Sequence, residues 1–125
     1  MHTDDPGLNA LSREVISCSF AVRNVLGGGF LEKVYENALV HEMRKRGLSV
    51  IQQRGIAVFY DGIQVGEYCV DLLVEQRVLV ELKAVKALED AHRGQCLNYL
   101  RGSGLKLCLL LNFGSPKLQI QRIIN

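Results

Sequence analysis

The segment VDLLVEQRVLVELKAV, residues 70–85, constrains the fold of this chain more than any other feature. Hydrophobic residues alternate with other residues on both sides of a short polar break, which predicts a β-hairpin with one buried face. A two-residue loop would pair Asp71 with Leu82 and mix polar and apolar residues on both faces. A three-residue loop at residues 75–77 instead predicts one face made only of hydrophobic side chains: Val70, Leu72, Val74, Val78, Val80 and Leu82.

The opposite face of the same hairpin carries charged side chains. The three-residue loop pairs Asp71 with Glu81 and brings Lys83 to the same side. Like charges directly opposite each other destabilise a sheet by up to ~1 kcal/mol, so this pair favours a cation between the two carboxylates. Two carboxylates with a backbone carbonyl suit Mg²⁺ or Mn²⁺, and a nearby lysine can stabilise a phosphoryl group. The spacing alone leaves two interpretations open: a metal site for phosphodiester hydrolysis, or a solvated charged strand face.

The rest of the chain predicts helices and further strands around this hairpin. Helical periodicity predicts three helices, and runs rich in β-branched and aromatic residues predict the strands that flank the hairpin. The apolar run LKLCLLLNF predicts a central strand. The expected order is α-α-β-β-β-α-β-β, an α/β domain with a mixed central sheet flanked by helices. The segments outside the hairpin are helices at about 6–26, 30–46 and 88–101 and strands within 48–69, 105–113 and 117–124.

Length, charge and cysteine content narrow the class of protein. With 125 residues, of which 48% are hydrophobic, the chain predicts a single domain over 1–125, with 1–7 as a loose N-terminal tail. The net charge of +2 neither requires nor excludes a polyanionic partner. Four cysteines without a Cys-x-x-Cys pair predict reduced core residues rather than zinc ligands. No apolar run approaches the ~18 residues of a membrane helix, so we expect no membrane association and a cytoplasmic location.

The charged hairpin and the helix after it resemble a known superfamily. Asp71, Glu81-x-Lys83 and then Gln95-x-x-x-Tyr99 resemble the pattern of the PD-(D/E)xK nuclease superfamily, and within it the branch with RecB-like and lambda-exonuclease-like enzymes. The resemblance implies a restriction-endonuclease-like core. In one departure, a valine precedes Asp71 where the superfamily name has proline.

A second motif resembles one family inside that superfamily. Gly29-x-x-Glu32-x-x-Tyr35 is similar to the signature of the GxxExxY protein family. The blocks VDLLVE, VELKAV, QCLNYL and LLLNFG follow in that family's order, so the likeness runs from about Leu8 to Ile124.

The resemblance also implies roles for individual residues. It makes Asp71 and Glu81 metal ligands, with the Leu82 carbonyl as a third ligand, and it makes Lys83 the catalytic lysine. Gln95 and Tyr99 lie one helical turn apart and would border the site, although a buried tyrosine with a hydrogen-bonded glutamine is the structural alternative.

An acidic residue from a neighbouring helix is also implied. Glu32 resembles the residue that holds metal-bound water in many such sites, and its structural alternative is a glutamate favoured by the helix dipole. Glu36 shares the same helix face and is a second candidate.

These implied roles define the expected function and its alternatives. The resemblance implies a Mg²⁺- or Mn²⁺-dependent nuclease acting on nucleic acid, with DNA favoured over RNA. One alternative is a catalytically inactive module of the same fold that binds nucleic acid or a protein partner. A small subunit of a larger complex is another, and the modest charge leaves room for a homodimer or partner that supplies basic surface.

Overall fold

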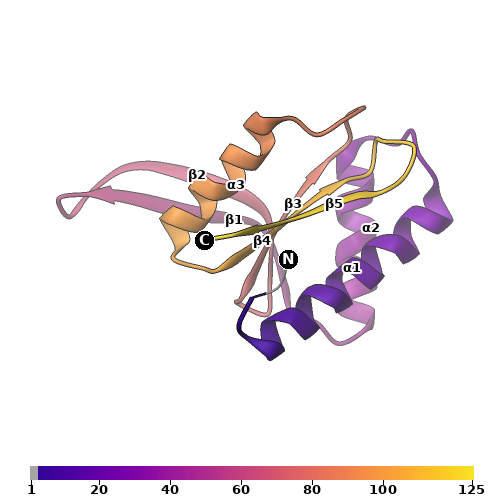
Figure 1. The fold of residues 1–125 in the computed structure, drawn as a ribbon, viewed down its shortest axis with the longest axis horizontal. Helices are drawn as coiled ribbons and strands as arrows, with labels where there is room; N and C mark the ends of the chain where they lie inside the picture. The colour runs from indigo at the N-terminus through magenta and orange to yellow at the C-terminus, as the bar shows by residue number, and fades with distance from the viewer. Residues whose placement is uncertain (1–2) are drawn as a thin grey trace.

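The computed structural model describes residues 3–125 and contains one five-stranded sheet between two helical layers (Figure 1). The order of helices and strands confirms the predicted order α-α-β-β-β-α-β-β. No helix in residues 3–125 is long and apolar enough to cross a membrane. The elements are α1 (Pro6–Leu26), α2 (Glu32–Lys45), β1 (Val50–Tyr60), β2 (Ile63–Val74), β3 (Val78–Lys83), α3 (Asp90–Ser103), β4 (Leu107–Asn112) and β5 (Gln119–Ile124).

The strands lie in the order β1-β2-β3-β4-β5. Neighbouring strands are antiparallel except β3 and β4, which are parallel and are joined through α3. A parallel pair requires such a crossover, because a tight turn can only reverse the chain. Every residue of β4 is buried, which confirms the prediction of a central strand. The sheet is therefore mixed, as expected.

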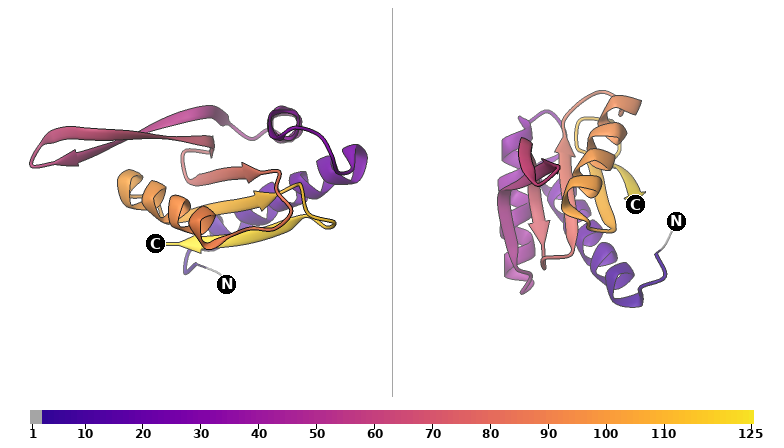
Figure 2. Two further views of the ribbon diagram at one scale, coloured as in Figure 1. Left: turned by 90° about the horizontal axis from the view of Figure 1, so that it is seen from above. Right: turned by 90° about the vertical axis from the view of Figure 1, so that its left-hand side faces the viewer.

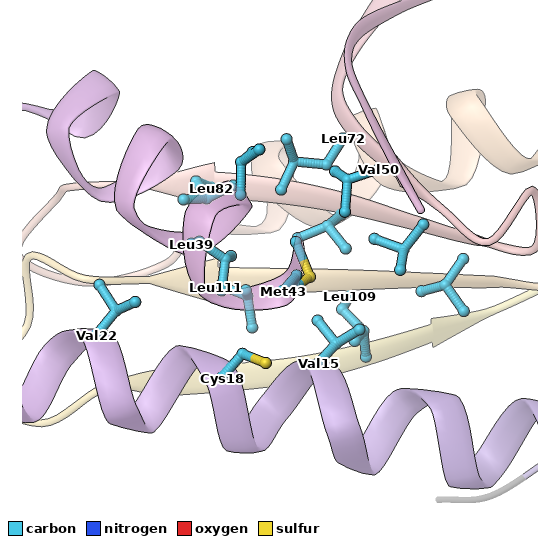
Figure 3. Close-up of a cluster of buried hydrophobic side chains, with 14 of the residues drawn as sticks. Val15, Cys18, Val22, Leu39, Met43, Val50, Leu72, Leu82, Leu109 and Leu111 are labelled. Atoms are coloured by element: carbon cyan, nitrogen blue, oxygen red, sulfur yellow. The ribbon is translucent and has the colours of Figure 1, made fainter. Parts of the chain in front are cut away.

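Each face of the sheet has its own hydrophobic core. Helices α1 and α2 cover one face, where Cys18, Leu39 and Met43 pack against Leu72 and Leu82 of the sheet (Figure 3). Helix α3 covers the other face, where Tyr99 and Leu100 pack against strand residues of opposite parity. Helices α2 and α3 therefore approach β3 from opposite faces of the sheet.

The side of the sheet on which Val70 packs differs from the prediction. Leu72 belongs to the core under α1 and α2, but Val70 belongs to the core under α3. Strand β1 changes in the same way, because Val50 packs under α1 and α2 while Ile56 packs under α3. Between these positions Gln53 has a left-handed backbone with φ of 53°, while Gln52 and Arg54 keep their pairing with Leu72 and Val70, so the two strands change faces together. The alternation counted from the hairpin loop therefore fails beyond Asp71.

Strands β1 and β2 continue past the rest of the molecule as a long ribbon. We call residues 57–67 of this ribbon the β1–β2 arm; its outer part projects away from the helices and the other strands (Figures 1 and 2). Several hydrophobic side chains near its tip are solvent-exposed, among them Phe59 at 63% and Tyr60 at 75% exposure. At its base the arm leads directly to Asp71.

The N-terminus of α1 is capped by a side chain. The Asp5 side chain accepts a hydrogen bond from the Leu8 N–H at 3.0 Å, and Pro6 occupies the first turn. Pro6 and Gly7, which the sequence assigns to a loose tail, lie within this helix. Residues 1 and 2 of that tail lie outside the described residues.

Candidate active site

The β2–β3 hairpin brings Asp71 and Glu81 together. Val74 pairs with Val78 and Leu72 with Val80, which confirms the three-residue loop. One step beyond Leu72, side chains replace backbone pairing. The Glu81 carboxylate accepts a hydrogen bond from the Asp71 N–H at 3.1 Å, and the Asp71 Oδ2 atom accepts one from the Leu82 N–H at 2.8 Å. The two strands are thus joined through both carboxylates.

Glu81 is the most enclosed member of this group, with 4% of its surface exposed. Its Oε2 atom accepts a hydrogen bond from the Tyr99 hydroxyl at 3.2 Å and lies 3.5 Å from Lys83 Nζ. Burial, followed by the nearby Asp71 charge, raises the pKa of Glu81 to about 7. Burial and the Glu81 charge likewise raise the pKa of Tyr99 above its usual range, so this phenol remains a proton donor at neutral pH.

Lys83 is the last residue of β3, and its backbone is hydrogen-bonded to the residue that follows β4. The Phe113 N–H donates a hydrogen bond to the Lys83 carbonyl at 2.8 Å. Asn112, which is fully buried beside Lys83, accepts from the Val85 N–H at 3.0 Å and donates to the Val85 carbonyl at 2.9 Å. These hydrogen bonds fix the backbone at Lys83 and Val85, and the Lys83 side chain, with 18% exposure, lies beside Glu81. Sequence reasoning missed Asn112, although a polar residue ending an apolar strand is a detectable signal.

Helix α2 contributes a second buried carboxylate. Glu36 is 1% exposed and accepts hydrogen bonds from Lys33 at 3.0 Å and from Gln52 at 2.9 Å. Gln53 also donates to both oxygens of Glu36, at 3.1 and 3.2 Å, and to Asp71 Oδ1 at 3.3 Å. One amide therefore connects the α2 carboxylate to the β2 carboxylate. The two glutamines were not identified from the sequence. The only signal there is that two glutamines stand side by side in a segment rich in β-forming residues.

Glu32 lies within the electrostatic reach of the same group. Burial raises its pKa, the Asp71 charge raises it further, and the Lys83 charge opposes the shift. The structure thus brings both α2 glutamates to the site, with Glu36 in direct hydrogen-bond contact and Glu32 as a half-buried neighbour.

The two remaining predicted site residues are Gln95 on α3 and Leu82 on β3. Gln95 is half-buried on α3, one turn before Tyr99, and within residues 3–125 its side chain forms no hydrogen bond to Asp71 or Glu81. The Leu82 side chain is fully buried in the core, and its N–H is the donor to Asp71. The structure therefore places Tyr99, rather than Gln95, against the carboxylates.

The donor set of the site fits a hard divalent cation. Within residues 3–125, no group of three or more His, Cys, Asp or Glu side chains is arranged to hold a metal ion. Asp71 and Glu81 do form a pair of adjacent carboxylates, and burial, followed by the Asp71 charge, raises the pKa of Glu81. Mg²⁺ and Mn²⁺ are commonly held by one or two carboxylates with water and substrate oxygens completing the shell. The residues present therefore fit such an ion.

Fold and site together define an α/β domain with a restriction-endonuclease-like core, in which Asp from β2, Glu-x-Lys from β3 and a helical Tyr from α3 meet beside a mixed sheet. Residues 9–123 match the family model described as the PD-(D/E)XK nuclease superfamily, and the chain belongs to that superfamily. No curated protein and no solved structure matches the chain.

Proposed function

We propose that this protein is a metal-dependent nuclease of the GxxExxY family, working as one cytoplasmic domain, that hydrolyses phosphodiester bonds of DNA, with RNA as the alternative substrate. The observation that carries the proposal is the meeting of Asp71, within β2, with Glu81 and Lys83 at the end of β3. A phosphodiester carries negative charge that increases during hydrolysis, and a cation beside a lysine stabilises that charge. Three of the four cysteines are buried as expected, whereas Cys69 is exposed; all four are free, which agrees with a reducing compartment.

The metal would be held by the carboxylates of Asp71 and Glu81, with the Leu82 carbonyl as the third protein ligand. When bound, Mg²⁺ or Mn²⁺ supplies a more acidic water and neutralises charge on the phosphoryl oxygens. Glu32, the half-buried neighbour on α2, would hold water on the open side of the site. The ion would also relieve the repulsion that raises the pKa of Glu81.

The remaining side chains would orient the Glu81 carboxylate and the nucleic acid and would neutralise charge on the phosphate. Lys83 Nζ, 3.5 Å from Glu81, would stabilise negative charge on the reacting phosphate. The Tyr99 hydroxyl, 3.2 Å from Glu81, keeps that carboxylate turned toward the site. Gln95 lies one turn earlier on the same helix and would contact the nucleic-acid strand.

The proposal is tested by replacing Lys83 with Ala. We expect the cleavage rate to fall at least about 100-fold, because the positive charge is lost while a partly exposed strand end tolerates the smaller side chain. The measurement is cleavage of labelled single-stranded, duplex, flapped and branched DNA and of RNA, with Mg²⁺, Mn²⁺ or EDTA. Glu81→Gln should also abolish cleavage.

The matched control is Lys86→Ala, which removes the same charge from an exposed loop position three residues later. Its cleavage rate should stay within about twofold of wild type, in line with an ordinary surface substitution. Full activity of Lys83→Ala, or cleavage that persists in EDTA, would contradict the proposed mechanism.

A binding module without turnover is the second candidate, favoured by the net charge of +2 and by the exposed hydrophobic residues of the β1–β2 arm. Such a module would bind nucleic acid or a protein partner, or form a homodimer. Metal-independent nucleic-acid binding that is unchanged in Asp71→Asn, with no cleavage by wild type, would support it. Purification as a stable heteromer would point to a protein partner.

A further inference from the structure

Gln53 makes more contacts to the site than its exposure suggests. Its amide nitrogen donates to both Glu36 oxygens, at 3.1 and 3.2 Å, and to Asp71 Oδ1 at 3.3 Å. Its amide oxygen accepts a hydrogen bond from the Cys69 thiol at 3.3 Å. The donor and the acceptor of this amide are therefore both engaged, which fixes which way the group faces.

The backbone of Gln53 adopts a conformation that its side chain disfavours. Its φ of 53° lies in the left-handed region, which glycine adopts readily and other residues adopt rarely. Gln52 pairs with Leu72 and Arg54 with Val70, so Gln53 stands opposite Asp71 between regularly paired neighbours. Unfavourable backbone at a functional site persists only where the surroundings determine it.

The contacts of Gln53 complete the restraint on Asp71. One oxygen of Asp71 accepts from the Leu82 N–H at 2.8 Å, and the other accepts from Gln53. With both oxygens engaged, the plane of the carboxylate is set. A neutral amide can do this without cancelling the negative charge that attracts a cation, whereas a lysine in the same place would cancel it.

We propose that Gln53 is a positioning residue, which orients Asp71 for metal binding and keeps Glu36 beside it. This inference rests on the proposed function. Groups that hydrogen-bond to metal ligands set ligand orientation, and their loss commonly costs about 10- to 100-fold in metal affinity or activity. Gln53 acts through Asp71 and does not touch the substrate.

The test is Gln53→Gly, which removes the amide but suits the left-handed backbone. We expect the dissociation constant for Mn²⁺, measured by calorimetric titration, to rise about tenfold. The midpoint of thermal unfolding without metal should stay the same or rise, because glycine relieves the backbone strain. The turnover number should fall while KM for nucleic acid stays unchanged, and Gln53→Asn, which keeps an amide, should recover part of the Mn²⁺ affinity.

The matched control is Gln76→Gly, in the β2–β3 loop. Gln76 has a φ of 57°, so the same exchange is made at nearly the same backbone angle away from the carboxylates. Its Mn²⁺ affinity should equal that of wild type. Wild-type Mn²⁺ affinity in Gln53→Gly, or an equal loss in Gln76→Gly, would overturn the positioning role and leave the nuclease proposal intact. Failure of wild type to bind Mn²⁺ at millimolar concentration would overturn both.

Discussion

Glu81 links the charge of the site to the stability of the protein. Its pKa in the folded state is about 7, raised from 4.5 by burial and by Asp71. The folded protein therefore binds a proton more tightly than the unfolded chain does, and ionising Glu81 weakens the fold. In EDTA, we expect this group to contribute up to about 3 kcal/mol of stability at pH 4.5 that is lost as the pH rises through 7. Urea unfolding midpoints from pH 4.5 to 8 measure this contribution.

The comparison that isolates this effect is Glu81→Gln. Glutamine keeps the shape and does not ionise, so the stability difference between variant and wild type should grow in favour of the variant between pH 4.5 and 7. The raised pKa of Glu32 acts in the same direction in both proteins and cancels in the difference. A pH-independent difference would show that Glu81 titrates normally.

Residues that meet across one hairpin were predictable from the sequence, and residues held by distant elements were not. The position of Asp71 opposite Glu81 follows from strand alternation and one loop length, both local properties. Gln53 and Asn112 reach the site through β1 and β4, whose places beside β2 and β3 depend on the whole sheet. The same limit explains Val70, because the face on which it packs changes together with that of the neighbouring strand β1.

At the scale of elements, two loops pack closely behind the site. A Cβ atom added at Gly114, in the β4–β5 loop, would lie 2.5 Å from the Ala84 carbonyl carbon and the Val85 nitrogen, in the loop that follows β3. Both neighbours are backbone atoms, so neither can move aside at a low cost in free energy. We expect Gly114→Ala to destabilise the fold by about 2 kcal/mol and to lower activity, because the same loop fixes Lys83. Urea unfolding and cleavage rates measure the two effects.

Gly66 offers the matched control for this substitution. A Cβ atom at Gly66, in β2, meets nothing within 4 Å. Gly66→Ala should therefore be neutral or stabilise the protein by up to about 1 kcal/mol through the unfolded chain. Equal effects at the two glycines would mean that close packing of the loops is not what requires Gly114.

The types and order of the elements were predicted well, and their ends less well. Helix α3 runs from Asp90 to Ser103, two residues later than predicted at both ends. Its N-terminus is set by a reciprocal capping pair between Glu89 and His92 rather than by the serine or threonine that usually marks a helix start. Residues Phe30 and Leu31 precede α2 instead of opening it. Element types follow from periodicity over many residues, whereas ends depend on single contacts.

At the scale of the whole molecule, the β1–β2 arm is the least supported part. A two-stranded ribbon is marginal by itself in water, and the tip of the arm, residues 59–65, carries exposed hydrophobic side chains. We expect its amide protons to exchange with solvent at least about 100-fold faster than those of the buried strand β4, as regions of low local stability do. Hydrogen–deuterium exchange followed by mass spectrometry measures this difference.

Equal protection of the arm and β4 would contradict this expectation. Protection of the arm that increases with protein concentration would instead show that a second copy covers it. Dilution over a hundredfold range separates the two cases.

Because β3 pairs with β4, which follows it in the sequence, this part of the sheet can assemble only late in synthesis. Both carboxylates of the hairpin are already in the nascent chain at residue 81, but Tyr99 and Asn112, which hold Glu81 and the end of β3, are translated later. Until α3 and β4 have left the exit tunnel, β3 has an open edge of hydrophobic residues. A chain that ends before β4 would therefore expose an unpaired edge of β3, and the candidate site would lack the contacts of Tyr99 and Asn112.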